Sequence, residues 1–556
     1  MGDKEMAINW FLGFLLVLVV LFFINNFKKK RRYKNLISEI RKSWGKKKED
    51  EYFNFEDISR YFRRNNHKKS VFHVISDQTS LDLDINEVFK FIDRTSSKIG
   101  QQFLYNKIRT IRDYKGLVEF NSFSKQFQKE ESTREETQIL LADLNNPEAY
   151  ALEELINGVQ IEKPKILWLI YSLSCSAALL IVLGFIYPAF FIGLIPVFLI
   201  NLVFHYKNKA DIGHYLGSIN ELSKALVISK KLKKSELIQN YFKDLSFIKE
   251  ISSIKFSTEF IRFEKKFDSE FYFLMWVISE LIKITFNIEY VIFYSFIYSI
   301  TAKRDSIEKM YLFIGEIDAA ISTASLMDDE IQQCTPVFTE QKEVKTNEIT
   351  HPLIDQCVSN DISLTGKSVL LTGSNMSGKT TFIRSVAINA LLAQTLNICF
   401  AKEYSAPFFK IYSSIRITDD LLQNTSYYLG EVLAVKNIIE ASESDSPCLF
   451  VLDELFKGTN TVERISGGKA ILSYLNKGNN LVLVSTHDIE LTELLESESY
   501  ELFHFSEKVE SNELSFDHKL KRGKLKTRNA IKILELYNYP EEIISEAKKI
   551  EQENFR

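Results

Sequence analysis

The sequence predicts two kinds of structure in one chain: an α/β domain with a phosphate-binding loop, and an all-α domain that carries transmembrane helices. The stretch 373–380 (GSNMSGKT) fits the pattern G-x-x-x-x-G-K-[ST] and lies between an apolar run and a helical pattern. Two stretches without a charged residue, 7–24 and 166–204, are long enough for membrane helices. With only 20 Gly and 9 Pro in 556 residues, the remainder is typical of long helices.

Length and charge limit the possible classes of protein. A chain of 556 residues is too long for one core and predicts two or three domains. The formal net charge of −3 gives no global attraction to nucleic acid, so any such contact depends on local basic patches. The five cysteines form no C-x-x-C pair and have no histidine at ligand spacing, which predicts reduced, structural thiols.

The first segment, 1–27, predicts an uncleaved transmembrane anchor. Asp3 and Glu5 precede the apolar run 7–24, and the basic cluster 28–32 follows it, which is the reverse of the order in a cleaved signal peptide. The positive-inside rule then places residue 28 and those after it in the cytoplasm.

The next segment, 28–80, is a basic juxtamembrane stretch. Its lysines and arginines are interleaved with Trp44, Tyr61 and Phe62. Binding to anionic lipid headgroups is the simplest interpretation of such a stretch beside a membrane anchor, with nucleic acid as the weaker alternative.

The uncharged stretch 166–204 predicts a transmembrane hairpin because it is about twice as long as one crossing needs. Gly184 and Pro188 mark the expected turn. The alternative is a buried pair of core helices, but few soluble cores contain so long an uncharged interval. Basic residues flank the stretch on both sides, which returns both ends to the cytoplasm: Lys163, Lys165, Lys207 and Lys209.

The hairpin is expected to interrupt a helical domain that covers 81–334. Within it, the apolar stretch 271–300 contains Glu280, Lys283 and Glu289, so we expect a buried helix of the cytoplasmic domain rather than another membrane helix. A charge-rich linker, 335–350, is expected to lead into the α/β domain.

The glycine-rich loop has a chemical reason for each of its residues. A short apolar strand, 368–371, precedes it and a helical pattern, 381–395, follows, which a chance match in a loop would not have. Glycines allow backbone N–H groups to approach phosphates, the lysine neutralises phosphate charge, and the threonine hydroxyl can bind Mg²⁺. The predicted nucleotide-binding residues are Gly373, Ser374, Asn375, Met376, Ser377, Gly378, Lys379, Thr380 and Thr381.

Two further strands complete the predicted site for ATP and Mg²⁺. An apolar run ends in Asp453, which is expected to order Mg²⁺ together with Thr380, and in Glu454, which is expected to polarise the attacking water. A third run, 481–485, leads to His487. Because ligands gather at the carboxyl ends of parallel strands, we expect His487 to contact the γ-phosphate, although alone it would pass for a surface histidine.

These motifs, in this order, resemble the ATPase domain of the MutS family, within the ABC-type ATPase class. Two helical stretches, 80–105 and 315–325, look like the start and end of that family's core and lever region. The matching stretches are TGSNMSGKTT (372–381) to TGPNMGGKST, DELFKGTNT (453–461) to DELGRGTST, STHDIEL (485–491) to ATHYFEL, DDLLQNTSYYLGE (419–431) to DDLxxGxSTFxxEM, and the His351-Pro352 element.

The resemblance implies a fold, a reaction and partners. The fold is an α/β P-loop ATPase domain over 351–520 beside an all-α core and lever domain, and a C-terminal tail, 521–556, resembles the family's dimerisation helices. The implied assembly is a homodimer through the ATPase domains and this tail, in which Ser426 completes the partner's site. DNA is the implied partner, by way of mismatch repair, yet we expect no mismatch-reading domain before residue 80.

This sequence differs from the family pattern at three places, none of which removes a catalytic group. Lys457 replaces the usual Arg, Ser377 replaces a Gly, and Tyr427-Tyr428 replaces the usual Thr-Phe. The sequence therefore predicts a multi-pass protein of the cell membrane whose cytoplasmic ATPase drives conformational change. Two alternatives without DNA are a transporter-type ABC ATPase and a signalling or scaffold ATPase. The expected membrane segments are too few to form much of a translocation path, which makes the transporter-type ATPase the weaker interpretation.

Overall fold

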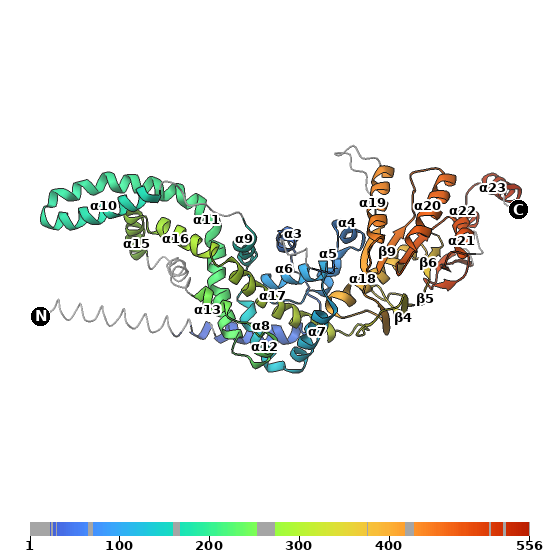
Figure 1. Cartoon of the computed structure of the whole chain (residues 1–556), viewed down its shortest axis with the longest axis horizontal. Helices are drawn as coiled ribbons and strands as arrows, with labels where there is room; N and C mark the ends of the chain where they lie inside the picture. Colours follow the sequence, from blue (N-terminus) through green and yellow to red (C-terminus); the bar gives the residue numbers. More distant parts are fainter. Residues whose placement is uncertain are drawn as a thin grey trace. The chain divides into compact units, whose positions relative to one another are not determined.

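The computed structural model describes residues 23, 26–28, 30–49, 51–64, 71–158, 167–252, 273–374, 376–416, 427–510, 513–525 and 530–554. Apart from Phe23, the predicted anchor at 7–24 lies outside these residues, and so do Asn375 and Ser426. The chain forms two compact units (Figure 1). Unit 1 contains 1–65, 93–104 and 123–329, and unit 2 contains 66–92, 105–122 and 330–556. The predicted bounds 81–334 of the helical domain do not coincide with this division.

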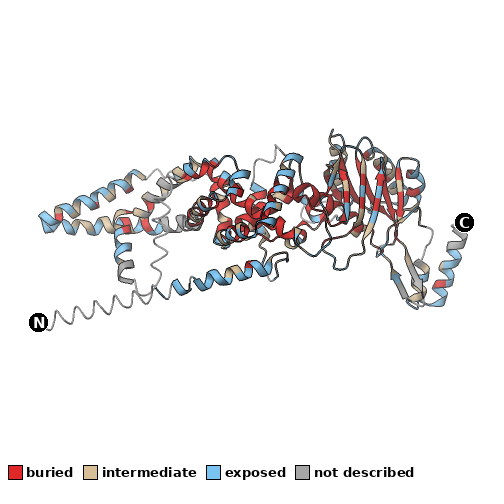
Figure 2. Ribbon diagram, turned by 90° about the horizontal axis from the view of Figure 1, so that it is seen from below, coloured by how far each residue is buried: buried red, intermediate tan, exposed pale blue. Residues whose placement is uncertain are grey.

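Unit 1 is helical. At its centre lies α17 (Arg304–Met327), most of whose residues are buried (Figure 2). The other helices wholly within unit 1 include α2 (Phe55–Ile58), α3 (Arg60–Arg64), α8 (Glu131–Ala142), α9 (Leu152–Asn157), α12 (Glu236–Tyr241) and α13 (Phe247–Ser252). The division between the units falls within two helices, α6 (Lys98–Arg109) and α7 (Tyr114–Lys129).

The helices α6 and α17 approach each other closely through two glycines. A Cβ atom on Gly315 would lie 2.5 Å from Phe103 Cβ, and one on Gly100 would lie 2.1 Å from Asp318 Oδ2. Asp318 accepts hydrogen bonds from Ser97 N and Oγ, at 2.8 and 2.6 Å, just before α6 begins. The two stretches that resemble the family's helical core are therefore in contact.

Residues 166–204 contain a helical hairpin. Helix α10 (Leu167–Ile186) is followed by the 3₁₀ turn η3 (Pro188–Gly193) and by α11 (Leu194–Leu232), which packs beside α10 and continues far beyond the uncharged stretch (Figure 1). Pro188 begins the turn as predicted. Gly184 does not, because it lies within α10, where its lack of a side chain admits the ring of Phe191.

The expectation of one buried helix over 271–300 is wrong. The structure has two helices, α15 (Phe273–Phe286) and α16 (Ile288–Thr301), broken at Asn287, whose φ is +48°. Helix α15 packs against α10 and α11, but Ile278 and Leu281 on its outer side are exposed. Glu280 and Lys283, two of the charges expected to keep this stretch out of a membrane, are largely buried and lie beside His205 of the hairpin helix α11.

Two aromatic residues of the juxtamembrane stretch belong to the core of unit 1. Tyr61 and Phe62 are buried, and the Tyr61 ring lies 4.6 Å from that of Tyr311, so neither side chain is available to lipid headgroups. Trp44 packs under the guanidinium of Arg134 and donates a hydrogen bond to Asp328 at 2.6 Å. Tyr61 and Phe62 therefore serve the core of unit 1, whereas lipid binding by the basic side chains of this stretch stays a prediction.

Unit 2 is built on a six-stranded sheet with the order β14-β11-β6-β10-β9-β8, in which only β14 is antiparallel. Its strands are β6 (Ser368–Thr372), β8 (Lys410–Ser414), β9 (Cys448–Asp453), β10 (Leu481–Thr486), β11 (Tyr500–His504) and β14 (Lys521–Arg522). The helices that pack around it include α18 (Lys379–Leu396), α19 (Tyr427–Ser442), α20 (Thr461–Leu475) and α21 (Ile489–Glu496).

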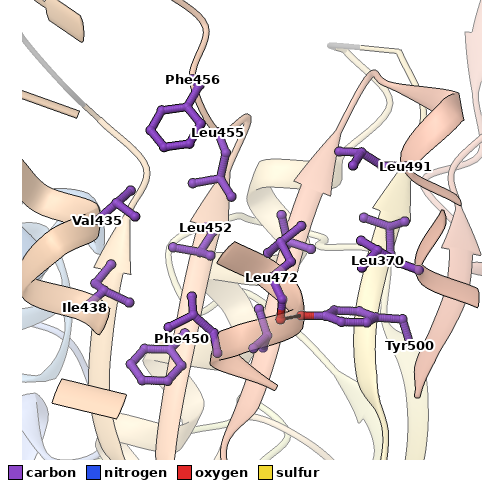
Figure 3. Packing of buried hydrophobic residues seen from close by; sticks show 14 of the residues in the cluster. Leu370, Val435, Ile438, Phe450, Leu452, Leu455, Phe456, Leu472, Leu491 and Tyr500 are labelled. Atoms are coloured by element: carbon purple, nitrogen blue, oxygen red, sulfur yellow. Dashed lines mark hydrogen bonds between the residues drawn. The ribbon is translucent and has the colours of Figure 1, made fainter. Parts of the chain in front are cut away.

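The central strands β6, β9 and β10 are mostly continuous apolar runs, as expected where both faces of a parallel sheet are covered. On one face, Phe450 and Leu452 of β9 pack with Leu472 of α20 and Val435 of α19 (Figure 3). Tyr500 lies in the same cluster and donates its hydroxyl hydrogen to Leu472 O at 2.8 Å. This core fixes the strands whose ends carry the predicted site.

A second sheet corrects the predicted linker at 335–350. Those residues form β3 (Val337–Thr339) and β4 (Glu343–Ile349), which join β5 (Asn360–Thr365) and β7 (Glu403–Pro407) in the order β3-β7-β4-β5. Unit 2 also contains β1 (His73–Val74), β2 (Thr110–Ile111), α4 (Asp77–Asp82), α5 (Ile85–Ile92), β12 (Glu507–Glu510), β13 (Glu513–Phe516), α22 (Ala530–Leu536) and α23 (Glu541–Asn554).

Candidate nucleotide site

The loop between β6 and α18 has the backbone of a phosphate cradle. Gly373 and Gly378 have φ values of +147° and +112°, which L side chains rarely adopt. A Cβ atom on Gly373 would also lie 2.8 Å from Phe505 O. Lys379 is buried, and its Nζ donates to Gly373 O at 2.6 Å and to Ser374 O at 3.0 Å.

The ends of β6, β9 and β10 lie side by side, because these are adjacent parallel strands. Thr380 Oγ1 donates to Asp453 Oδ2 at 2.7 Å, so the two predicted Mg²⁺ ligands meet. Ser485, at the end of β10, donates to the other carboxylate oxygen of Asp453. Ser485 was not among the predicted residues, although it directly precedes the Thr-His pair that marked this strand end.

Glu454 is held between two cationic or hydrogen-donating side chains. Its Oε2 lies 2.5 Å from Lys457 Nζ, and its Oε1 contacts His487 Nε2. Burial raises the pKa of Glu454, but the hydrogen bonds from His487 and Lys457 and the charges of both lower that pKa to about 2. Glu454 is therefore ionised at neutral pH and chemically able to accept a proton, but both of its oxygens are occupied.

The turn after Glu454 depends on a residue that sequence reasoning did not assign. Glu431, on α19, is buried and accepts a hydrogen bond from Phe456 N. Both Glu454 and Phe456 have positive φ values, +53° and +61°, so this turn needs external support. Burial raises the pKa of Glu431, and the backbone hydrogen bonds from Phe456 and Lys457, which lower that pKa, offset the effect only in part. The only signal in the sequence was the final glutamate of the stretch 419–431.

A cavity of about 440 Å³ adjoins the phosphate cradle. It has a mixed lining, which includes Met376, Thr381, Asn360, Phe505 and His518. His518 Nδ1 lies 3.0 Å from Ser377 O, and His518 O accepts from Asn360 Nδ2 at 3.1 Å. Neither His518 nor Asn360 lies in a recognisable motif, so no sequence pattern singles them out.

These residues fit a nucleoside triphosphate with Mg²⁺. The Ser374 hydroxyl oxygen is buried and has no hydrogen-bond partner among the residues that the structure describes. Burial disfavours the charged form of Lys379 and lowers its pKa. An anionic phosphate beside its ammonium group would stabilise the charged form and offset this effect. Hard oxygen donors such as Thr380 and Asp453 suit Mg²⁺, which is usually bound by one or two protein oxygens together with phosphate oxygens of the substrate. The adjoining cavity leaves room for the rest of a nucleotide.

Of the predicted site residues, the structure brings together Lys379, Thr380, Asp453, Glu454 and His487 at one edge of the sheet. Gly373, Ser374, Ser377 and Gly378 form the loop beside them, whereas the Met376 side chain is exposed and faces the cavity. Asn375 and Ser426 lie outside the described residues, so their predicted roles stay predictions.

Comparisons with known proteins agree with this geometry. The family model for MutS domain V matches residues 369–554. A DNA mismatch repair protein MutS of Listeria welshimeri is 30% identical over 275 residues, which cover 48% of this chain and 32% of that protein. One of Staphylococcus aureus is 29% identical over 275 residues, 48% of this chain and 31% of its own length. The aligned part thus spans about a third of these relatives. By this match and by the geometry of its site, residues 369–554 of the chain are similar to domain V of the MutS family.

Proposed function

We propose that this chain is a membrane-bound ATPase that couples ATP binding and hydrolysis to a change of conformation. The observation that supports the proposal most strongly is the meeting of Lys379, Thr380, Asp453 and Glu454 at one edge of the six-stranded sheet. Each of these side chains has the chemistry that one step of ATP hydrolysis requires.

In the proposed reaction, Lys379 and the backbone amides of 373–378 bind the phosphates. Thr380 and Asp453 hold Mg²⁺, which neutralises charge on the phosphate oxygens when it is bound. Glu454 accepts the proton of the attacking water after Lys457 or His487 has released one of its oxygens. A released His487 can donate a hydrogen bond to the γ-phosphate.

ATP hydrolysis by the purified full-length chain tests the proposal. We expect Mg²⁺-dependent release of phosphate, and loss of most of it in Asp453→Asn, because an amide is a poorer Mg²⁺ ligand than a carboxylate. Glu493→Gln, at an exposed position of α21, is the matched control and should keep the wild-type rate. Activity that survives Asp453→Asn unchanged would contradict the proposed site.

Coupling to the helical unit is proposed to pass through Asp84. Its carboxylate lies 3.2 Å from Arg384, one turn into α18 after Lys379 and Thr380, and 2.5 Å from Arg416, just after β8. The following helix, α5, leads along the chain toward 93–104 of unit 1. A shift of α18 upon phosphate binding would therefore move Asp84 and, along the chain, the helix α5 that leads to residue 93.

The hairpin is proposed to cross the bilayer. Leu179, Val182 and Phe185 of α10, and Leu199 and Val203 of α11, are all more than half exposed. Both helices thus expose large apolar side chains, and no charged residue occurs over 167–204. The hydrocarbon core of a bilayer favours such a surface. By length and composition α17 could also cross a membrane, but its mean hydropathy is lower than that of α10 and it is buried within unit 1, so we do not propose that it crosses.

Reporter fusions in cells test the topology. A reporter inserted after Lys209 should be cytoplasmic, and one inserted at 190, in the turn η3, should lie outside. Protection of residue 190 from external protease, with exposure from inside, would overturn the membrane hairpin.

DNA association is proposed from the relatives, whose printed names are DNA mismatch repair protein MutS. Binding of duplex DNA by the full chain, measured from about 50 to 200 mM salt, tests it, because phosphate contacts weaken steeply with salt. Saturable binding with a steep salt slope supports DNA as the partner. Absence of binding at the lowest salt would favour a membrane ATPase that acts on another partner.

A further inference from the structure

We propose that α15 enters the bilayer beside the α10–α11 hairpin and ends inside it, so that lipid hydrocarbon covers the outer side of α15. The inference rests on the proposed membrane hairpin and extends it to a segment whose charges had argued against a membrane position.

The distribution of side chains on α15 is reversed relative to a surface helix in water. Ile278, Leu281 and Ile282 are 47–48% exposed, whereas the side chains of Glu280 and Lys283 are only 14% and 6% exposed. A soluble helix places its apolar stripe against the core and its charges in solvent. Apolar residues outside and charges inside are expected when hydrocarbon surrounds the helix.

The enclosed charges have partners on the hairpin. Glu280 lies 3.2 Å from Nε2 of His205, which is 3% exposed on α11, and 3.1 Å from Lys283 Nζ. Ionisable groups at membrane depth face the interior of a helix bundle and pair with one another. The His205–Glu280–Lys283 cluster meets that requirement.

The end of α15 is capped by side chains of the hairpin. Thr285 O accepts from Asn201 Nδ2 at 2.7 Å, and Phe286 O accepts from Ser174 Oγ at 2.7 Å. Asn287, which is buried, donates to Asn201 Oδ1 at 2.6 Å. The last carbonyls of a helix lack partners within it, and in hydrocarbon they must be satisfied by protein. A helix that ended in water would need no such caps.

The contacts also give the depth of α15. Glu280 meets His205 whereas Asn287 meets Asn201, so α15 runs antiparallel to α11 and toward the turn η3. Asn201 lies two turns into α11, about 10 Å from its start, in a hydrocarbon layer about 30 Å thick. Helix α15 therefore ends within the layer, and α16 returns to α17 (Figure 1). This describes a re-entrant helix rather than a crossing.

Photo-crosslinking to lipid tests the inference with the full chain in phosphatidylcholine–phosphatidylglycerol vesicles. The crosslinker p-benzoylphenylalanine is placed at 282 on α15, at 182 on α10, and at 136, an exposed position of α8. We expect lipid adducts at 282 and 182 in similar yield, and at least tenfold less at 136. Position 281 repeats the α15 measurement in case one insertion disturbs the helix.

The outcomes separate the two proposals. Adducts at 182 but at neither 281 nor 282 would overturn the re-entrant helix and leave the hairpin in the membrane. Absence of adducts at all three positions of the two helices would overturn both. Adducts at 136 equal to those at 282 would show non-specific labelling at the vesicle surface and would also overturn the inference.

Discussion

At the scale of single residues, the site depends on the hydrogen bonds and ion pairs that position each catalytic side chain. The carboxyl ends of β9 and β10 were predictable because an apolar run that stops at Asp453-Glu454 or at Thr486-His487 is a local pattern. Glu431 and His518 were not predictable, because each acts through a backbone atom distant in sequence, Phe456 N and Ser377 O. No local rule reports such tertiary contacts.

We expect Glu431→Ala to lower kcat about tenfold or more with little change in KM, because the turn that positions Glu454 loses its support. Glu431→Gln is the matched control, since its amide oxygen can still accept from Phe456 N. Steady-state ATP hydrolysis measures both. If the glutamine variant loses as much activity as the alanine variant, the charge of Glu431 matters rather than its hydrogen bond.

Two buried histidines predict acid sensitivity of unit 2. Burial lowers the pKa of His73 and of His351 to about 4, although a hydrogen bond with Ile411 O favours the charged form of His73. Between pH 6.5 and 4 the unfolded chain binds more protons than the folded one, so stability is full above pH 6.5 and falls as pH decreases. Each histidine contributes up to about 3 kcal/mol.

Denaturant midpoints measured from pH 7.5 to 5 check this expectation. His73→Gln, whose amide can still donate to Ile411 O, should reduce the loss of stability at low pH, whereas His504→Gln, at a histidine near the surface, should not. An unchanged pH dependence in His73→Gln would exclude His73 as a source.

At the scale of elements, the sequence specified those with a strong local signature. The strand-loop-helix from β6 to α18 follows from apolar patterning and glycine geometry. Strands β3 and β4 were missed because their alternating polar residues resemble an exposed linker until their partners β5 and β7 are known. The break between α15 and α16 was missed because it depends on Asn287 in a left-handed conformation, and the side chain of Asn287 is held by Asn201 of the hairpin, a contact distant in sequence.

The α6–α17 crossing gives a prediction at this scale. Gly315→Ala should lower the free energy of unfolding by about 1–3 kcal/mol, because its Cβ would lie 2.5 Å from Phe103 Cβ. Gly468→Ala, also in a helix interior, places its Cβ at an ordinary 3.8 Å from Leu491 and should stabilise by about 0.5–1 kcal/mol. Thermal unfolding of both variants checks the opposite signs; equal effects would contradict the tight crossing.

At the scale of the whole molecule, the resemblance implies two chains that share their catalytic sites. Chains with Ser426→Ala or Glu454→Gln should each be nearly inactive, and mixing them should restore part of the ATPase rate. Mixed dimers can combine the intact Ser426 of one chain with the intact Glu454 of the other. Should Ser426 only cap a helix, its loss would cost about 1 kcal/mol of stability and mixing would leave the rate at the single-variant level.

The separation of ATP binding from ATP hydrolysis decides whether this site works as described. We expect Lys379→Ala to abolish binding, because it removes the buried cation that faces the phosphates, whereas Glu454→Gln should bind ATP as wild type and hydrolyse it about a hundredfold more slowly. Equilibrium binding of labelled ATP and single-turnover hydrolysis measure the two steps. Equal loss of binding in both variants, or wild-type hydrolysis by Glu454→Gln, would contradict the assigned roles.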